Sequence, residues 1–567
     1  MTKAMLGRVI GGARATAALA ICAAVPVLLA AVALAHDDIH GRPHFKGLPA
    51  NPTAVMRALK ADQHAAQSLP QASNVNCLGG VADGYPCHNV DLLAFLPLAD
   101  VGGAGPLSSA NDVWGWTDSD SGREFALLGR HDGTAFVEIT DPANPVYLGK
   151  LPTHASSSTW RDIKTYADHA FIVSEASGHG IQVFDLTALL ALDPAGAPYT
   201  LAADAQYNGF GNAHNIVINE DSAFAYGVGT GTCSGGLHMV DISTPTVPTF
   251  AGCYSGDGYT HDAQCVVYGG PDIAHQGKEI CFASNEDTLT IVDVTNKASP
   301  ALISRTSYPG DAYTHQGWLT PDHRHFLLDD ELDEQSFGHD TRTRVFDLSD
   351  LDSPQVAGSF DNATAAIDHN QYVLGDHVFQ ANYTSGLRIL KIIGAETADL
   401  SEVAYFDIYP ANDNASFNGA WSTYPYFPSG TVVVSGIEQG LFILRPNLSA
   451  GPPPVGEAPA APDNLAVADN GAGAVLITFR DNSDDETGFQ LEREKQHKKH
   501  GWGGATMIEL GADSESHTDA SGKGTFRYRV RAVNGFGTSD WTGWAEVTVT
   551  ESGGGKGPKC HPRRGCS

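Results

Sequence analysis

The sequence predicts an all-β protein in which a seven-bladed β-propeller is followed by an immunoglobulin-like β-sandwich. A short strand motif that ends in an acidic or polar position recurs at intervals of roughly 45–55 residues, the length of a four-stranded blade. The stretches between the copies hold strand-like runs and turn residues, with almost no helical periodicity. The seven copies begin at Thr134, Gly180, Gly236, Asp287, Thr343, Gly386 and Gly440.

The first 35 residues predict an export signal, so we expect a secreted or cell-surface protein. Three basic residues accompany an apolar stretch at residues 15–34, and Ala33-Leu34-Ala35 offers a small-x-small cleavage site. Because the apolar stretch is long for a signal, an uncleaved anchor is the competing interpretation. We expect residues 36–76 to form a flexible leader, and no later segment predicts a transmembrane anchor.

The charge of the chain restricts its partners. The net charge is −31, and removal of the signal leaves 31 basic against 65 acidic residues, a charge of −34. Such a surface repels nucleic acid and anionic membranes. We therefore expect an extracellular ligand or surface component of unknown identity as the partner, and no nucleic acid.

The cysteines predict disulfides. One of the nine lies in the signal, and the even number that remains is typical of disulfide-bonded exported proteins. No C-x-x-C spacing predicts a thiol catalyst or a zinc knuckle. The spacing leaves the connectivity open, and we expect local pairs: Cys77–Cys87, Cys233–Cys253, Cys265–Cys281 and Cys560–Cys566.

A strand near the N-terminus is expected to close the propeller. The seventh motif ends near Leu444, and a proline-rich segment follows before an outer strand could form. Residues 92–98 resemble the outer strand of the first blade, at residues 146–152, and would supply the missing strand. Closure of this kind removes the open edges of a ring of sheets. The propeller is therefore placed at residues 77–446.

The C-terminal part changes character after a Pro-rich linker at residues 447–462. Alternating strands of a small sandwich follow, with the motifs Glu486-Thr-Gly-Phe and Tyr528-Arg-Val-Arg-Ala-Val-Asn-Gly-Phe-Gly. In these motifs residues 463–551 resemble a bacterial fibronectin type III domain, with Phe479 where that family usually has tryptophan. The resemblance implies a spacer or adhesive unit. A basic tail is expected at residues 552–567.

Motifs within the propeller resemble two groups of surface proteins. The strand copies resemble LVIVD-type repeats of bacterial and archaeal surface proteins. Asp112-Val-Trp-Gly-Trp-Thr-Asp, Trp160-Arg-Asp-Ile-Lys and Ser174-Glu-Ala-Ser-Gly-His-Gly resemble the choice-of-anchor B family. That family carries varied C-terminal anchors, whereas this sequence shows a sandwich and a basic tail without an apolar anchoring helix. We therefore expect release or non-covalent retention, and the resemblance implies no reaction.

Polar residues recur at one point of each blade. The register places one of them at the start of each innermost strand, at one mouth of the central channel. The second strands return to the same face and end near Glu175, Glu286, Asp329, Asp330, Glu331, Asn382 and Glu438. From both sets we select as candidate metal- or ligand-binding residues His214, His261, His315, His369, Arg161, Glu175, Glu286 and Asp330.

Two interpretations of this set stay open. Imidazoles ringed by carboxylates have the ingredients of a divalent transition-metal site, in which the metal would polarise a substrate or activate water. Without a metal, a histidine would act as a general base. The competing interpretation is a structural network of polar channel side chains and trapped water, repeated with the blades.

These interpretations give two hypotheses of function. The leading hypothesis is a non-catalytic extracellular binding protein that uses this propeller face, with no certain cofactor. The alternative is a metal-dependent extracellular enzyme, either a hydrolase or an oxidase, with its site in the histidine-lined channel. No catalytic residue is assigned from the sequence.

Overall fold

The protein consists almost entirely of small β-sheets, which confirms the all-β prediction. A short helix, α2 (Asp333–Phe337), and a few single turns interrupt the strands. A hairpin of β1 (Leu34–Asp37) and β2 (Pro43–Lys46) belongs to a separate N-terminal unit. The structure, a computed structural model, describes residues 34–37, 43–46, 73–103, 108–448 and, with short gaps, 459–550.

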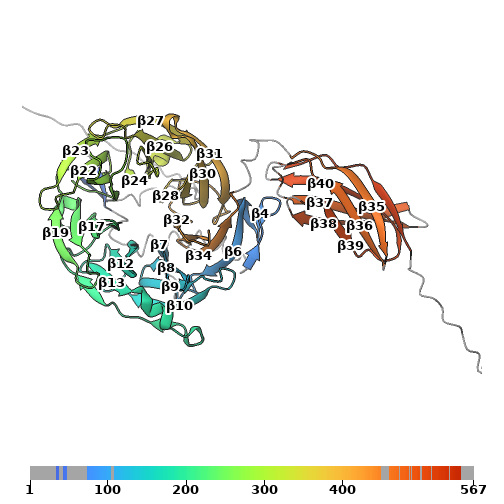
Figure 1. Cartoon of the computed structure of the whole chain (residues 1–567), viewed down its shortest axis with the longest axis horizontal. Coiled ribbons are helices and arrows are strands. Elements are labelled where there is room, and N and C mark those ends of the chain that lie inside the picture. The colour runs from blue at the N-terminus through green and yellow to red at the C-terminus, as the bar shows by residue number, and fades with distance from the viewer. Residues whose placement is uncertain are drawn as a thin grey trace, which may run out of the picture. The chain divides into compact units, whose positions relative to one another are not determined.

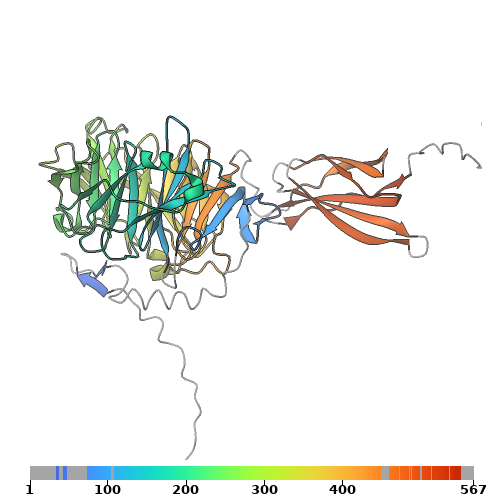
Figure 2. The ribbon, with the colours of Figure 1, turned by 90° about the horizontal axis from the view of Figure 1, so that it is seen from below.

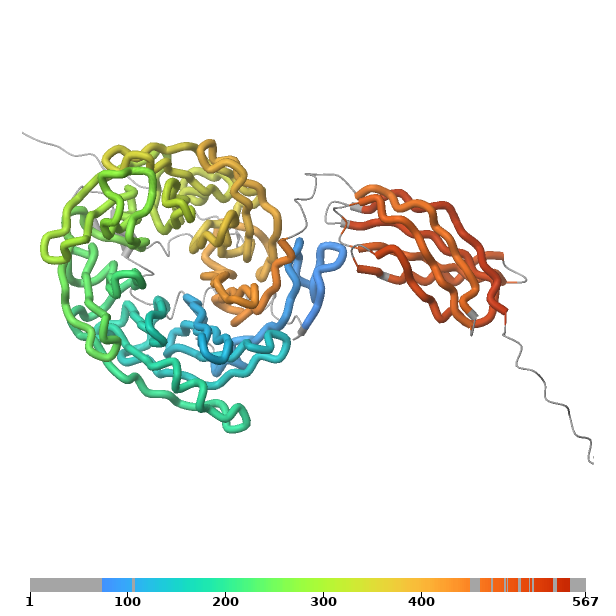
Figure 3. Tube along the Cα trace, viewed as in Figure 1, coloured from blue at the N-terminus to red at the C-terminus, as the bar shows by residue number. Residues whose placement is uncertain are grey.

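Residues 73–448 form a ring of sheets around a common centre (Figure 1; Figure 3). The first strand of each sheet contacts the first strand of the next sheet, and the last of them returns to the first. Figure 2 shows the ring from the side, with the strands running roughly along its axis. This is a propeller-like repeat arrangement. The central strands are β7 (Ala110–Thr117), β11 (Arg161–Tyr166), β16 (Asn215–Asn219), β20 (Asp262–Val267), β24 (Thr314–Leu319), β28 (Gln371–Leu374) and β32 (Ala420–Tyr424).

Five sheets continue outward from their central strand in chain order. The recurring motif of the sequence forms the third strand of each sheet, and its apolar side chains are buried because neighbouring sheets cover both faces. To β7 are added β8 (Glu124–Arg130), β9 (Gly133–Glu138), β10 (Val146–Pro152) and β14 (Tyr199–Thr200). To β11 are added β12 (His169–Ser174), β13 (Ile181–Asp185) and β15 (Ala205–Tyr207). To β16 are added β17 (Phe224–Val228), β18 (His238–Asp241) and β19 (Thr249–Cys253). The sheet of β20 continues with β21 (Glu279–Ser284), β22 (Leu289–Asp293) and β23 (Ala301–Thr306). The sheet of β24 continues with β25 (His325–Asp330), β26 (Arg342–Asp347) and β27 (Gln355–Asp361).

The last two sheets contain strands from the N-terminal part. The sheet of β28 holds β29 (His377–Ala381), β30 (Leu387–Gly394), β31 (Asp399–Phe406), β5 (Tyr85–His88) and β4 (Val81–Ala82). The sheet of β32 holds β33 (Val432–Gly436), β34 (Gly440–Pro446), β6 (Val90–Pro97) and β3 (Ser73–Val75). Strand β6 pairs antiparallel with β34, and Phe95 stacks on Phe442 with ring centroids 4.3 Å apart. The predicted closure of the ring by residues 92–98 is therefore confirmed.

Side chains of the central strands also join neighbouring sheets. Asp162 Oδ2 accepts a hydrogen bond from Ile216 N at 2.7 Å. The side-chain amide of Gln316 donates from Nε2 to the carbonyl oxygen of Gln371 at 3.0 Å and accepts at Oε1 from Gln371 N at 3.1 Å. Part of the polar lining of the ring is thus structural, because these groups satisfy each other between sheets.

Three disulfides confirm the predicted local pairing at Cys77–Cys87, Cys233–Cys253 and Cys265–Cys281. Such bonds are typical of proteins outside the reducing cytoplasm. The pair Cys560–Cys566, most of the predicted signal peptide and the basic tail lie outside the described residues. Within the part of the chain that the structure describes, no helix is long and apolar enough to cross a membrane.

The described residues from 459 to 550 form two sheets that share one apolar core. Phe479 is buried in this core with Phe489 and Tyr528. One sheet holds β35 (Asp463–Gly471), β36 (Ala474–Arg480) and β39 (Ser516–Asp519). The other holds β37 (Gly488–His497), β38 (Gly501–Gly511), β40 (Gly524–Asn534), β41 (Gly537–Thr538) and β42 (Ala545–Val549).

Candidate metal centre

Four histidines from four successive sheets form a row of neighbouring, mutually tilted rings, which we call the histidine row. His214 and His261 directly precede β16 and β20, and His315 is the second residue of β24. His369 lies two residues before the first residue of β28. Neighbouring ring centroids along the row are 4.2, 4.1 and 4.4 Å apart. Because the central strands all begin at the same end of the ring, one residue from each sheet is enough to build the row.

The tautomer of two of these imidazoles is fixed by the backbone. His261 donates from Nδ1 to the carbonyl oxygen of His315 at 3.0 Å. His369 donates from Nδ1 to the carbonyl oxygen of Trp421 at 2.5 Å. Since a carbonyl oxygen can only accept, the proton of each neutral ring lies on Nδ1 and the lone pair lies on Nε2.

The other two imidazoles are held by carboxylates. His214 Nδ1 lies 2.7 Å from Glu175 Oε1, and His315 Nδ1 lies 2.9 Å from Asp329 Oδ1. A carboxylate behind the far nitrogen of an imidazole is the arrangement that orients metal-binding histidines. Within the described residues, no hydrogen bond is formed at Nε2 of any ring in the row.

Glu331 lies against the row. Its Oε1 accepts a hydrogen bond from the Tyr383 hydroxyl at 2.6 Å and lies 3.7 Å from His369 Nε2, while its Oε2 lies 4.0 Å from His315 Nε2. One ligand atom each from His261, His315 and Glu331 lies within 4.8 Å of the other two. Imidazole nitrogens with one carboxylate suit Zn²⁺ and other divalent transition metals.

Burial controls the charge of this group. It lowers the pKa of His261 and His315 well below the usual value and that of His369 to about 3, so these rings are neutral and able to bind a metal. Burial would also lower the pKa of His214, but its carboxylate partner and Glu331 outweigh it and raise the pKa. The pKa of Glu331 rises to about 7 through burial, so this carboxyl changes its protonation near neutral pH.

Other residues of the predicted set make different contacts. Arg161 is buried and lies 3.0 Å from His179 Nε2, between the first two sheets. Asp330 accepts a hydrogen bond from the Tyr308 hydroxyl at 2.8 Å and so holds the loop before β24. Glu286 pairs through its backbone with the first residue of β24. Of the selected carboxylates, Glu175 therefore holds a ring of the row directly.

Two residues outside the selected set complete the group. They are Glu331, which follows the end of a second strand, and Tyr383. Side chains alternate along a strand, so Asp329 and Glu331 point to one side of β25 and its extension, while Asp330 points to the other. This alternation was the signal that distinguishes Glu331 from Asp330.

A second buried charge group lies on the central strands β7 and β11. Lys164 Nζ lies 2.6 Å from Asp162 Oδ1, 3.7 Å from Asp112 Oδ2 and 4.4 Å from the centroid of the Trp114 ring. Lys164 balances the charge of Asp162, and burial raises the pKa of Asp112 well above its usual value. We interpret this group as structural, in line with the network interpretation of the channel.

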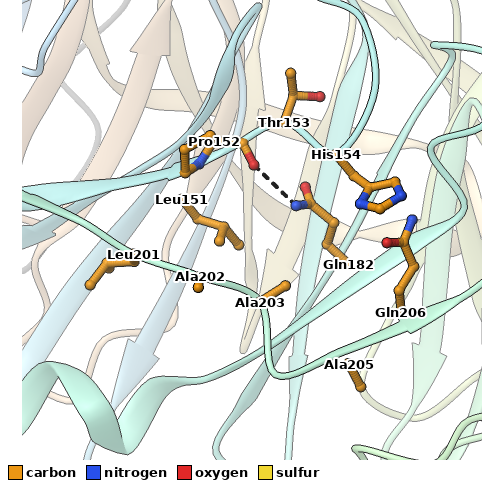
Figure 4. Close-up of a pocket in the computed structure, with 10 residues that line it drawn as sticks. All are labelled: Leu151, Pro152, Thr153, His154, Gln182, Leu201, Ala202, Ala203, Ala205 and Gln206. Atoms are coloured by element: carbon orange, nitrogen blue, oxygen red, sulfur yellow. Dashed lines mark hydrogen bonds between the residues drawn. The ribbon is translucent and has the colours of Figure 1, made fainter.

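A pocket of about 540 Å³ lies elsewhere on the ring (Figure 4). Its wall includes Leu151, His154 and Leu201, and Gln182 donates from Nε2 to the carbonyl of Pro152 at 3.0 Å across it. The lining contains none of the selected site residues.

Two segments of the ring match a known repeat family. Residues 210–255 and 271–307 match the LVIVD repeat, which is a propeller-type repeat. The first segment covers the sheet of β16, and the second covers β21 to β23. A comparison with curated proteins gives no match.

Solved structures resemble the chain in part. A functionally unknown protein from Desulfotomaculum acetoxidans is 12% identical over 58% of this chain and 89% of its own, with a TM-score of 0.36. A protein from Lactobacillus plantarum is 12% identical over 67% of this chain and 94% of its own, with a TM-score of 0.38. A Fn3-like protein from Clostridium thermocellum is 19% identical over 17% of this chain and 97% of its own, with a TM-score of 0.14. These similarities assign no function to the chain. The comparisons identify LVIVD repeats in it.

Proposed function

We propose that this chain is an exported binding protein that holds a divalent transition metal at the histidine row, on one face of a seven-bladed β-propeller. The repeat matches, the ring of sheets and the disulfides support this proposal. The proposed organisation is a signal peptide (1–35), a leader (36–76), the propeller (77–446), a linker (447–462), a fibronectin type III-like domain (463–551) and a basic tail (552–567). The C-terminal domain acts as a spacer or adhesive unit.

The observation that carries the proposal is the shared orientation of the imidazoles. Each ring of the row turns Nδ1 to an oxygen atom and leaves Nε2 without a hydrogen bond. Glu331 brings a carboxylate within 4.0 Å of the Nε2 atoms of His315 and His369. Each of these Nε2 atoms is therefore available as a metal ligand.

A metal held in this way would serve recognition. A donor atom of an extracellular partner, such as an imidazole or a carboxylate, would complete its coordination. The positive ion would also make a local attachment point on a chain that is strongly acidic overall. This is how the leading hypothesis, a non-catalytic binding protein, uses the row.

A metal-dependent hydrolase or oxidase is the second candidate function. The observation in its favour is Glu331, whose pKa of about 7 suits a general base beside metal-activated water. If the chain is an enzyme, turnover of ester, phosphoester or phenol substrates will depend on added metal. It will then disappear in Glu331→Gln, while a binding protein shows no turnover in either form.

Metal binding is tested on the full chain, purified without a histidine tag and stripped by a chelator. Calorimetric titration should show tight binding of about one Zn²⁺ at the row. We expect His261→Gln and His315→Gln each to weaken this binding by at least about 100-fold, and Glu175→Gln by about 10–100-fold, because the last change affects only the orientation of a ligand.

The matched control is His169→Gln, because this histidine of β12 binds only a backbone carbonyl, 2.6 Å from its Nδ1. It should titrate like the unchanged protein. The proposal is wrong if the stripped protein binds no transition metal, or if folded His261→Gln and His315→Gln bind as many equivalents of Zn²⁺ as the control. Far-UV circular dichroism establishes which variants are folded.

A further inference from the structure

A second group of metal-ligand side chains lies at helix α2 and shares no residue with the histidine row. Asp333 and Glu334 open the helix, and His339 follows Gly338, whose φ of 74° ends the helix in a left-handed turn. One ligand atom from each of Asp333, Glu334 and His339 lies within 4.8 Å of the other two. The short helix and its turn therefore bring two carboxylates and one imidazole together.

These ligand atoms are buried and unsatisfied. Asp333 is 0% exposed and Glu334 is 2% exposed. Asp333 Oδ1, Glu334 Oε2 and His339 Nε2 make no hydrogen bond to any described residue. Leaving a buried polar atom without a partner costs about 1–3 kcal/mol, and more for a charged group. Three such atoms in one place indicate that something else occupies the space between them.

The imidazole of His339 faces the carboxylates with its lone pair. Its Nδ1 donates to the carbonyl oxygen of Asp340 at 2.8 Å, so the proton of the neutral ring lies there. Its Nε2 lies 3.4 Å from Asp333 Oδ2 without forming a hydrogen bond. Two acceptors at this distance repel each other unless a positive charge lies beside both.

A further carboxylate increases the excess of negative charge. Asp368 is 0% exposed, and neither of its oxygens has a hydrogen-bond partner. Burial raises its pKa, and so do the nearby carboxylates of Asp329 and Asp333. Arg344 Nη2 lies 2.5 Å from Asp333 Oδ2 and supplies one positive charge to the group. Ionisation of all three carboxyls, Asp333, Glu334 and Asp368, would leave two negative charges beyond the one that Arg344 balances, and burial accordingly raises the pKa of Glu334 and Asp368.

Protonation satisfies part of this arrangement, because a proton on His339 Nε2 would face Asp333 Oδ2 at 3.4 Å. A proton on Glu334 shared with Asp333 would satisfy that pair. It would leave His339 Nε2 and both oxygens of Asp368 as they are. A protonated Asp368 would in turn need an acceptor for its new donor. A bound cation satisfies the lone pairs and reduces the charge at the same time.

We propose that Asp333, Glu334 and His339 bind a second divalent cation, with Asp368 as the carboxylate that balances its charge. Two carboxylates and one imidazole suit Mn²⁺ or Zn²⁺, whereas Ca²⁺ takes oxygen ligands alone. The cation would tie α2 to the turn that follows it. Because Glu331 lies two residues before Asp333, the same ion would hold in place the segment that carries Glu331 to the histidine row.

A third group of similar composition shows the contrast. Asp272, His275 and Asp352 also bring ligand atoms within 4.8 Å of one another. Here Asp272 accepts hydrogen bonds from the backbone, and His275 lies 3.3 Å from Asp352 on one side and 3.3 Å from Lys278 on the other. These groups satisfy each other, so they give no reason to infer an ion.

The test uses the full chain carrying His261→Gln and His315→Gln, so that the histidine row does not contribute. After chelator treatment, Mn²⁺ is titrated and followed by calorimetry and by the electron paramagnetic resonance of free Mn²⁺. We expect saturable binding of about one Mn²⁺, or of Zn²⁺ in competition with it. At about 100 times the dissociation constant, the ion should raise the Tm by roughly 3–5 °C.

Glu334→Gln, which keeps the shape of the side chain, and His339→Gln should each abolish both the binding and the Tm shift. If Glu334→Gln fails to fold, His339→Gln carries the test, because His339 is partly exposed at the end of the turn. The matched control is Asp340→Asn, which removes an exposed neighbouring charge and should leave both unchanged.

Several results would overturn the proposal. These are the absence of saturable Mn²⁺ or Zn²⁺ binding, binding that survives folded Glu334→Gln and His339→Gln, and binding of Ca²⁺ alone, which would exclude the imidazole ligand. Failure here is distinct from failure of the proposed function. The cation site at α2 is tested in a chain that lacks two histidines of the row, whereas the proposed function is tested by the loss of Zn²⁺ binding when histidines of the row are replaced.

Discussion

Replacing Lys164 by methionine should destabilise the ring strongly, because the lysine is the buried counter-charge of two carboxylates. Its ammonium lies 2.6 Å from Asp162 Oδ1 and 3.7 Å from Asp112 Oδ2, and both carboxylates are at most 5% exposed. Methionine has a similar length and no charge. The substitution therefore leaves two neighbouring acids buried without a cation.

The magnitude follows from removing one partner of a buried ion pair, which costs about 3–5 kcal/mol. Burial would raise the pKa of Asp162, but the ion pair with Lys164 outweighs it and holds this pKa below the usual value of 3.8. A depressed carboxyl pKa stabilises the folded state above the unfolded value, and this stability is lost as the pH falls through the folded pKa. The cost of Lys164→Met should therefore be largest near pH 8 and smaller at pH 4, where Asp162 of the variant, which has lost its cation, takes up a proton.

Chemical unfolding followed by tryptophan fluorescence measures this cost at both pH values. The control is Lys150→Met, because Lys150 and its partner Asp132 are both 28% exposed and such a pair contributes at most about 1 kcal/mol. A double variant, Lys164→Met with Asp162→Asn, should recover part of the loss. Equal costs for the two lysines at pH 8, or a cost that grows on acidification, would refute the argument.

Three further changes test other parts of the fold. Phe442→Ala removes a fully buried ring from β34, the strand that pairs with β6, and should lower the free energy of unfolding by about 3–5 kcal/mol, measured with denaturant. Replacing Cys265 and Cys281 by serine opens a loop of 16 residues and should cost about 3 kcal/mol relative to the oxidised protein, by the same measurement. Tyr528→Phe removes the 2.8 Å hydrogen bond to Asp519 and should lower the calorimetric transition of the C-terminal sandwich by the equivalent of about 1 kcal/mol, while the ring is unaffected.

Repetition made most of the ring predictable. Each copy of the motif is a third strand buried on both faces, so its apolar run survives in every sheet and can be counted. The closing strand was predictable because residues 92–98 resemble an outer strand that the seventh sheet lacks. The extra strands β5 and β4 beside β31 were not expected. They extend the sheet of β28 beyond its fourth strand, and the repeated motif of the sequence does not predict strands at that position.

The histidine row was predictable for the same reason, and its partners were not. Four successive repeats carry a histidine at the start of their central strand, and these histidines must converge because the ring brings those strands together. Arg161 occupies the same register but binds His179 between two sheets, because its long side chain reaches a neutral partner there. Register fixes where a backbone position lies, whereas the direction of a long side chain depends on which partners surround it.

The group at α2 shows what local composition cannot supply. Residues 329–334 contain five acids, a composition typical of a solvated surface. In the structure Asp329 and Glu331 turn to the row, Asp330 turns to a loop, and Asp333 and Glu334 are buried in the turn of α2. An acidic run becomes a candidate cation site only when its oxygens are removed from water and left without donors. Burial of that kind arises where β25 and α2 meet Asp368, which lies 31 residues after the end of α2. For this reason the variants at Glu334 and His339, and not any sequence pattern, decide whether a cation is bound there.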